Sequence, residues 1–322
     1  MLKMVIVKDV IYRFVEISDF FKKIIDTPEF NRLRRIKQLG LACYVYPSAN
    51  HTRFEHSIGV FYLAGKVCDK LGSENVSERE KVLVQTAALL HDIGHVSFSH
   101  LTDYILEEKK VDEKIAKHEY RSIALLEKIN NRLRIFSENE IQSISDMILG
   151  NFKNKDKPFL FQIVSNKLFG LDVDRLDYLQ RDMYYTGMHC FQSDYILECL
   201  TLKEGNLAVF KKGVSEIEMM YEARKRLLTL VCRHKTVLKI EYILRQCLEK
   251  LNLTEESFIS DWEKLDDYKM TVCIIEKCPE LFAFIENRNL KNVPDLSSEK
   301  FKHIKLIYRN DIENEIKKTI WV

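Results

Sequence analysis

Apolar side chains recur at helical spacing along most of the chain, and this pattern predicts a protein built from α-helices. The clearest runs contain Phe54, Ile58, Phe61, Leu63 and Val67; Val82, Ala88, Leu89 and Leu90; and a longer series from Tyr221 to Leu248. Polar or glycine-bearing breaks separate such runs at residues 72–77, 150–158 and 287–300. We therefore expect an all-α fold in which these breaks connect the helices.

Strand character is limited to two short segments. Residues 207–210 face those after Thr201 across Gly205, which predicts a small β-hairpin, and residues 5–15 are rich in β-branched side chains that are expected to pair elsewhere. The predicted fold class is thus all-α with at most a small hairpin. Since we find no internal repeat, we expect one domain over residues 1–322. Its core is expected at about residues 30–185, with a C-terminal helical part at about residues 215–322.

The charge and cysteine composition narrows the classes of partner and compartment. The 322 residues contain 50 Lys and Arg against 48 Asp and Glu, a formal net charge of +2. This near-neutral balance argues against broad binding to nucleic acid or to a membrane. The 8 cysteines include no CxxC pair, and Lys8 and Asp9 interrupt the apolar start of the chain, so no secretion signal is expected. These features favour free thiols and an intracellular protein, cytoplasmic or nuclear.

Histidines are concentrated in one region, where six of the nine lie within residues 51–118. An apolar helical segment leads directly into His91 and Asp92, which offer a nitrogen and an oxygen ligand side by side. His56 on an earlier helical segment and Asp174 on a later one provide a further nitrogen and oxygen. Two imidazoles and two carboxylates suit Mn, Fe, Co, Ni or Zn better than Ca. An ion held there can activate water and polarise a phosphate.

The ordinary interpretation of these residues is structural. A single histidine on an apolar helix is more often a core residue than a ligand, and an isolated His-Asp pair carries little information. The metal interpretation depends on co-occurrence, because His95, His100 and His118 accompany the pair and an aspartate cluster follows it. We therefore favour a metal site.

The combination of His56, His91-Asp92 and Asp174 resembles the HD superfamily of phosphohydrolases. The resemblance extends to its deoxynucleoside triphosphate (dNTP) triphosphohydrolase branch, in the animal type that carries a sterile-alpha-motif domain before the HD domain. That extra domain is not expected here. Matching segments lie at residues 27–40, 53–57, 90–95, 98–100, 118–119, 163–167 and 170–182, within a similarity over roughly residues 3–310. The resemblance implies a helical HD core and release of a deoxynucleoside and inorganic triphosphate, with Mg²⁺ as a candidate second ion on the phosphates.

The resemblance also implies roles around the metal. Arg53, Arg175 and Arg224 match positions that contact phosphates, although Arg224 lies in a basic run that is equally typical of a solvated face. The positions implied to do acid or base work, or to orient the groups that do, are His95, His100, His118, Asp103 and Glu119. The two acids are about as well explained as ordinary cap or surface residues. The positions implied around the deoxyribose are Gln38, Leu39, Tyr178 and Asp182.

Two positions depart from the family pattern. Leu228 stands where the family usually has His, and Cys232 stands where it has a Tyr that helps to exclude a ribose 2′-hydroxyl. The smaller Cys232 opens space at the sugar, so strict deoxyribose selection is in doubt.

Nucleotide activation and assembly are further expectations from the resemblance. Asp26 and Arg34 match positions that read a guanine between subunits, and Lys235 and Arg309 match basic positions of a neighbouring activator site. A GTP or dNTP activator and a homo-oligomer, dimer or tetramer, are therefore expected.

Two other functions stay open. The metal ligands alone do not select a substrate, so the chain can also be a different HD phosphohydrolase, either a 5′-nucleotidase or a phosphodiesterase. Two basic groups motivate a non-catalytic protein that binds nucleotides or nucleic acid, with nucleic acid as a secondary partner. They are Arg32, Arg34, Arg35 and Lys37, and the run 224–226 (Arg224-Lys225-Arg226).

Overall fold

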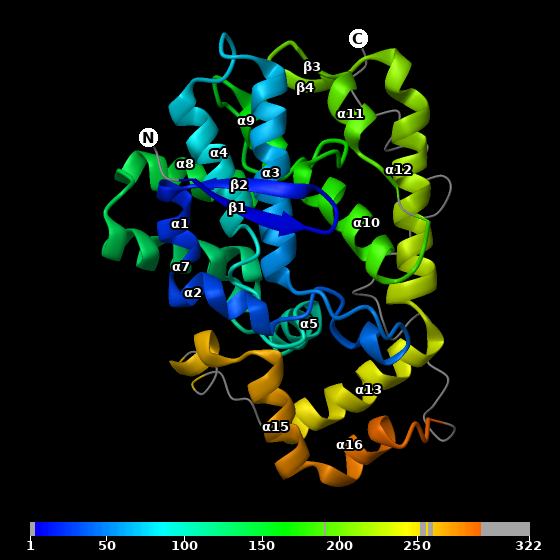
Figure 1. Cartoon of the computed structure of the whole chain (residues 1–322). Helices are drawn as coiled ribbons and strands as arrows, with labels where there is room; N and C mark the ends of the chain where they lie inside the picture. Colours follow the sequence, from blue (N-terminus) through cyan, green and yellow to red (C-terminus); the bar gives the residue numbers. More distant parts are fainter. Residues whose placement is uncertain (1–3, 190, 252–255, 257–259, 291–322) are drawn as a thin grey trace.

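Helices make up most of the computed structural model, which describes residues 4–189, 191–251, 256 and 260–290 (Figure 1). The helices are α1 (Asp19–Ile25), α2 (Pro28–Asn31), α3 (Arg53–Leu71), α4 (Glu78–Leu90), α5 (His100–Glu108), α6 (Glu113–Ala116), α7 (His118–Leu133), α8 (Glu138–Leu149), α9 (Pro158–Val164), α10 (Val173–Tyr185), α11 (Asp194–Cys199), α12 (Val214–Leu227), α13 (Lys235–Lys250), α15 (Asp267–Lys277) and α16 (Pro279–Glu286). The all-α prediction is confirmed. In the described part of the chain, no helix combines the length and apolar character that a membrane crossing requires.

Two antiparallel hairpins accompany the helices. Strands β3 (Leu200–Lys203) and β4 (Asn206–Val209) form the hairpin predicted around Gly205, with Leu202 opposite Leu207. The second hairpin differs from the prediction of at most one. The β-branched N-terminal segment folds back on itself as β1 (Met4–Asp9) and β2 (Arg13–Ser18), because Asp9 accepts the backbone N–H groups of the turn.

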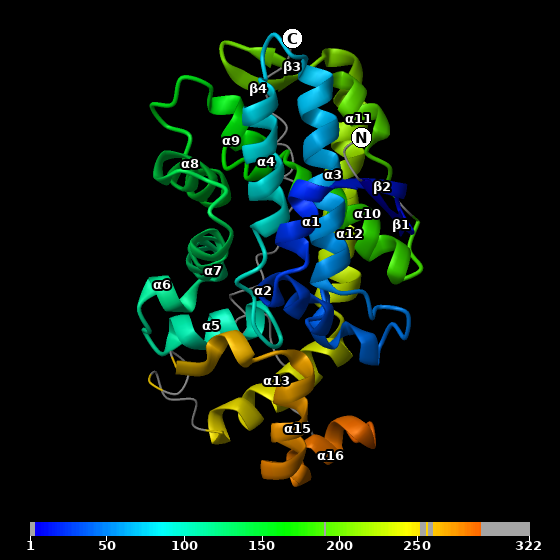
Figure 2. The ribbon, with the colours of Figure 1, turned by 60° about the vertical axis from the view of Figure 1, so that its left-hand side comes forward.

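Helix α3 forms the centre of the molecule, with α4 and α10 packed on either side of it (Figures 1 and 2). Its predicted apolar residues, from Phe54 to Val67, are all buried. At the start of α4 the Ser77 hydroxyl accepts the Glu80 N–H, and the Glu80 carboxylate accepts the Ser77 N–H in return. Such a capping box fixes where the helix begins. Helix α4 then ends at Leu90, immediately before the His91-Asp92 pair.

The C-terminal run of apolar residues is not one continuous helix. Helix α12 ends at Leu227, and a single π-helical turn, Leu228–Cys232, precedes α13. The bend exposes nearly half of Leu230, whose place in the helical pattern predicted burial. Helices α13, α15 and α16 then lie together at the end of the molecule opposite β3 and β4 (Figures 1 and 2).

Candidate active site

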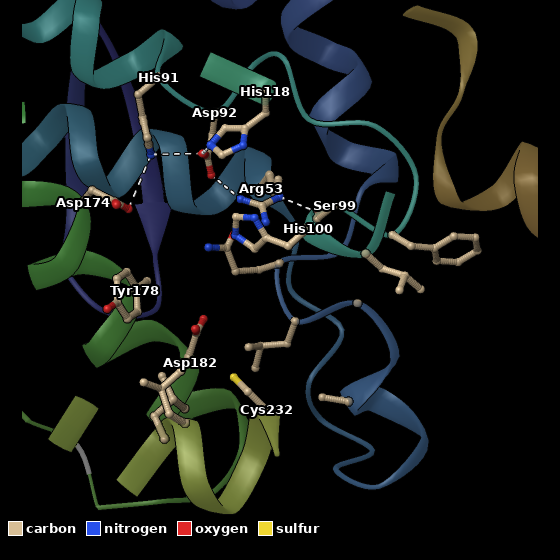
Figure 3. Close-up of a pocket in the computed structure, with 18 of the residues that line it drawn as sticks. Arg53, His91, Asp92, Ser99, His100, His118, Asp174, Tyr178, Asp182 and Cys232 are labelled. Carbon is tan, nitrogen blue, oxygen red and sulfur yellow. Dashed lines mark hydrogen bonds and ion pairs between the residues drawn. The ribbon is translucent and has the colours of Figure 1, made fainter. Parts of the chain in front are cut away.

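The four predicted metal ligands converge from three helices. His56 lies in α3, His91 and Asp92 follow the last residue of α4, and Asp174 lies in the first turn of α10. His56 Nε2 is 3.2 Å from His91 Nε2, 3.0 Å from Asp174 Oδ1 and 3.6 Å from Asp92 Oδ2. His91 Nε2 is 3.4 Å from both Asp92 Oδ1 and Asp174 Oδ1 (Figure 3). These are the separations expected of donor atoms around one cation.

The tautomers of both imidazoles support a metal site. His91 Nδ1 lies 2.8 Å from the Ala88 carbonyl oxygen, which can only accept, so Nδ1 carries the proton. His56 Nδ1 lies 2.8 Å from Asp177 Oδ2 and donates to it in the same way. Each Nε2 then presents a lone pair to the other and to two carboxylates. A cation satisfies all four groups at once, and the fixed tautomer is typical of histidine ligands.

The electrostatics agree with this donor set. Burial lowers the pKa of His56, but its hydrogen bonds to Asp174 and Asp177 outweigh burial and raise the pKa to about 10. The pKa of Asp174 is lowered, because the two histidines outweigh the effect of burial. His56 thus strongly retains a proton at the place proposed for the metal ion. A divalent cation would match the charge of the two carboxylates better than this proton does.

A second group of histidines lies beside the metal ligands. His95 stacks on His118 with ring centroids 3.8 Å apart, and His100 lies 4.9 Å from His95. His118 Nδ1 donates to Asp103 Oδ2 at 2.8 Å, while its Nε2 lies 3.9 Å from Asp92 Oδ1. Burial lowers the pKa of His118, but the bond to Asp103 outweighs burial and raises it. His118 is therefore held by Asp103, with its Nε2 directed toward the proposed metal ligand Asp92.

One cavity of about 510 Å³ contains most of these groups. It is lined by Gln38, Leu39, Gly40, Ala42, Arg53, His91, Asp92, Phe98, Ser99, His100, Leu101, His118, Glu119, Ile148, Val164, Ser165, Asp172, Asp174, Tyr178, Asp182, Arg224, Leu227, Leu228, Cys232, Val237 and Glu241. Figure 3 shows Asp182 and Cys232 at the end of the cavity away from His91 and Asp92.

Comparison with known proteins agrees with this geometry. Residues 53–182, which include all four proposed metal ligands, match the HD domain family. The chain carries an HD domain.

Relatives of this HD domain include longer proteins. The chain is similar to the deoxynucleoside triphosphate triphosphohydrolase SAMHD1 homolog of Dictyostelium discoideum, with 31% identity over 314 residues, 90% of this chain and 60% of that protein. Human deoxynucleoside triphosphate triphosphohydrolase SAMHD1 is 34% identical over 263 residues, 72% of this chain and 42% of its own. An uncharacterized protein of Methanocaldococcus jannaschii is 33% identical over 294 residues, 89% of this chain and 58% of its own. The chain therefore spans about half the length of these relatives.

Most of the predicted substrate residues line the cavity, from inside and outside the matched HD segment. Gln38, Leu39, Arg53, Tyr178, Asp182 and Arg224 line it, together with Leu228 and Cys232. Arg175 is not among the lining residues, because its guanidinium turns back to the Gly170 carbonyl oxygen. Glu119 lines the cavity, but its carboxylate is 3.6 Å from His118 Nδ1, so Asp103 alone holds that imidazole by a hydrogen bond.

The three predicted activator residues that the structure describes, Asp26, Arg34 and Lys235, do not line the cavity. Asp26 forms an exposed ion pair with Lys22, and Arg34 lies over the Phe54 ring with its guanidinium carbon 3.5 Å from the centroid. Lys235 is exposed at the start of α13. Arg309 lies outside the described residues.

Several residues that support the proposed ligands had no role assigned from the sequence. Asp177 holds His56, and its place one helical turn after Asp174 is the signal that could have identified it. Ser122 Oγ donates to the His91 carbonyl at 2.7 Å and accepts the Gly94 N–H at 2.9 Å. A side chain at Gly94 would collide with the backbone of α7, so glycine at this position allows the loop after Asp92 to reach His118.

Arg53 contacts one of the proposed metal ligands directly. Its Nη1 pairs with Asp92, and its Nε donates to Ser99 Oγ at 2.8 Å (Figure 3). The nearby guanidinium outweighs burial and lowers the pKa of Asp92, which stays ionised as a ligand should. Arg53 thus adds positive charge directly beside the proposed metal site.

Proposed function

We propose that the chain is a metal-dependent phosphohydrolase that cleaves dNTPs to a deoxynucleoside and inorganic triphosphate. The observation that carries the proposal is a single cavity that joins the proposed metal site to a polar group at its other end. Arg53, His100 and His118 line the cavity beside His91 and Asp92, and Asp182 lines the end away from them (Figure 3). A polyphosphate fits the first end, and the hydroxyl groups of a sugar fit the second.

The resident ion is proposed to be Mn, Fe, Co, Ni or Zn, held by His56, His91, Asp92 and Asp174, with Mg²⁺ accompanying the phosphates. Such an ion supplies Lewis-acid polarisation of the phosphate and activation of water. The chain's own residues do the remaining work. Water attacks the α-phosphorus, the bond to the nucleoside 5′-oxygen breaks, and protonated His118 gives its Nε2 proton to that oxygen. Asp103 keeps His118 charged and correctly turned.

The test is a product analysis. Each dNTP and each ribonucleoside triphosphate is incubated with the protein, with Mn²⁺ or with EDTA, and the products are separated by chromatography. We expect deoxynucleoside and triphosphate in equal amounts, lost with EDTA and in His91→Ala. His189→Ala is the matched control, because His189 is exposed and belongs to neither histidine group. Release of a nucleoside monophosphate, or turnover of monophosphates or cyclic nucleotides alone, would refute the proposal and favour the other HD phosphohydrolases.

Nucleic acid is the less favoured substrate because two of its candidate basic residues, Arg32 and Arg35, bind groups within the protein. Arg32 is buried, and its guanidinium donates to the carbonyls of Ile93 and His95, both at 2.6 Å. Arg35 pairs with Asp266. A cationic face for phosphates is therefore not supported at this segment.

Assembly and activation are proposed with the same reaction. Asp26 and Arg34 are proposed to read a guanine, and Lys235 and Arg309 to hold the phosphates of a second nucleotide, in a dimer or tetramer. Light scattering of the protein with and without GTP, alongside the dNTP assay, tests this. An unchanged mass and an unchanged rate on adding GTP would contradict it.

A further inference from the structure

Glu241 is the cavity residue that the proposed reaction leaves without a role. It lies on α13, two turns after the helix begins, and lines the same cavity as the metal ligands. Its Oε2 atom is fully buried and makes no hydrogen bond in the part of the chain that the structure describes. A buried carboxylate oxygen without a donor is costly, so its retention needs an explanation.

The surroundings of Glu241 indicate which part of a ligand it meets. Phe98, Leu101 and Val237 also line the cavity, and Phe98 and Leu101 pack in one apolar cluster with residues of α13. Val237 lies one turn before Glu241 on α13, and Cys232, which precedes that helix, lines the end of the cavity away from His91 (Figure 3). Glu241 therefore adds an acceptor to an otherwise apolar wall beside the nucleoside end of the cavity.

A second acceptor without a partner points the same way. Gln38 Oε1 is also buried and unbonded within the described residues, and it lines the same cavity. Both atoms require hydrogen-bond donors, and the apolar side chains that line the same cavity, such as Leu39 and Val237, suit a flat ring rather than another phosphate. A nucleobase presents such donors as ring and amino N–H groups.

We propose that Glu241 reads the base of the bound nucleotide and selects guanine. The inference rests on the proposed dNTP reaction. The two oxygens of a carboxylate match the adjacent N1–H and N2–H donors of guanine. Adenine and cytosine present one amino group beside a ring-nitrogen acceptor, and thymine presents one N–H between two carbonyl oxygens. With those bases one carboxylate oxygen faces another acceptor, which is unfavourable in a buried site.

The ligand-free state of Glu241 fits this role. Burial raises the pKa of its carboxyl to about 8, because among the described residues no donor offsets the burial. Two N–H groups from a base supply the missing hydrogen bonds and favour the ionised form.

The experiment compares kcat/KM for dGTP and dTTP in the wild type and in Glu241→Gln. Glutamine keeps the size but replaces one acceptor by an NH₂ group, which faces a guanine donor. We expect the dGTP to dTTP ratio to fall by about 10- to 100-fold, the loss typical of a hydrogen bond to a charged group. Glu249→Gln is the matched control on the same helix, since Glu249 is exposed and pairs with Arg245 at 3.0 Å; its ratio should not change.

Two outcomes would overturn the inference. One is an unchanged ratio of dGTP to dTTP, which includes an equal loss with both substrates. The other is a change confined to the ratio of dGTP to GTP, which would mean that Glu241 reads the sugar. Equilibrium binding of deoxyguanosine and thymidine to both proteins tests the selectivity without turnover. If no dNTP is hydrolysed, the proposed reaction fails alone. If the wild type binds both nucleosides equally, the base selection fails whatever the reaction.

Discussion

Asp177→Asn tests whether the histidine tautomer assembles the metal site. Asp177 is fully buried, accepts the His56 Nδ1 proton at 2.8 Å and pairs with Arg181 through two contacts of 2.9 Å. Asparagine has one acceptor atom for these three N–H groups, and it has no charge. The imidazole thus loses the charged partner that makes its Nε2 a strong ligand. Replacing such a supporting carboxylate typically weakens metal affinity by about 10- to 100-fold.

The assay is a titration of the metal-free protein with Mn²⁺, in which binding is measured by calorimetry or by dNTP turnover. We expect the variant to need about 10- to 100-fold more metal for half-saturation, with turnover recovering toward the wild-type value at excess metal. Arg181 keeps Asp9 at 2.9 Å, so the fold should persist, and melting in EDTA checks this. Asp69→Asn, an exposed acid on the same helix as His56, is the control. Equal metal affinity in variant and wild type would refute the reasoning.

Three further perturbations follow from the site and the core. Asp103→Asn removes the hydrogen bond that raises the His118 pKa, so the loss of turnover as pH rises should begin at lower pH than in the wild type; an unshifted pH profile would contradict a donor role for His118. Cys232→Tyr should lower kcat/KM for ribonucleotides relative to deoxynucleotides, by at most about 100-fold, in the substrate panel described above. Leu89→Ala, at a fully buried position of α4, should lower the free energy of unfolding by about 2–5 kcal/mol in denaturant titrations, and a loss below 1 kcal/mol would indicate that the core relaxes around the cavity.

Helical periodicity predicted the part of the fold that carries the metal site. The apolar residues of α3 are buried as expected, and His56, His91 and Asp174 converge with Asp92 beside them. The sequence of each helix was sufficient for this prediction, because its cap residues and apolar face determine where the helix begins and which side is buried. The π-helical turn at Leu228–Cys232 was not predictable in this way, since its sequence continues the same apolar pattern.

The direction in which a side chain points is the feature that the sequence resemblance does not predict. Arg175 matches a phosphate-binding position, yet in this structure it donates to the Gly170 carbonyl. Glu241 resembles any other acid in a helix until its buried oxygen and neighbours are seen together. Both depend on contacts between distant segments, which spacing along the chain does not report.

The buried arginines explain how the loop after Asp92 stays in place. Arg32 binds the carbonyls of Ile93 and His95, and Arg121 donates to the Gly94 carbonyl at 2.8 Å while it pairs with Asp103. The carbonyl oxygens of three successive loop residues are thus held by guanidinium groups, and these arginine side chains have almost no exposure to solvent. A basic residue in the sequence suggests a partner outside the protein, but here the charge satisfies backbone oxygens that no helix could pair. The precision of the His95 and His118 positions therefore depends on residues that never reach the substrate.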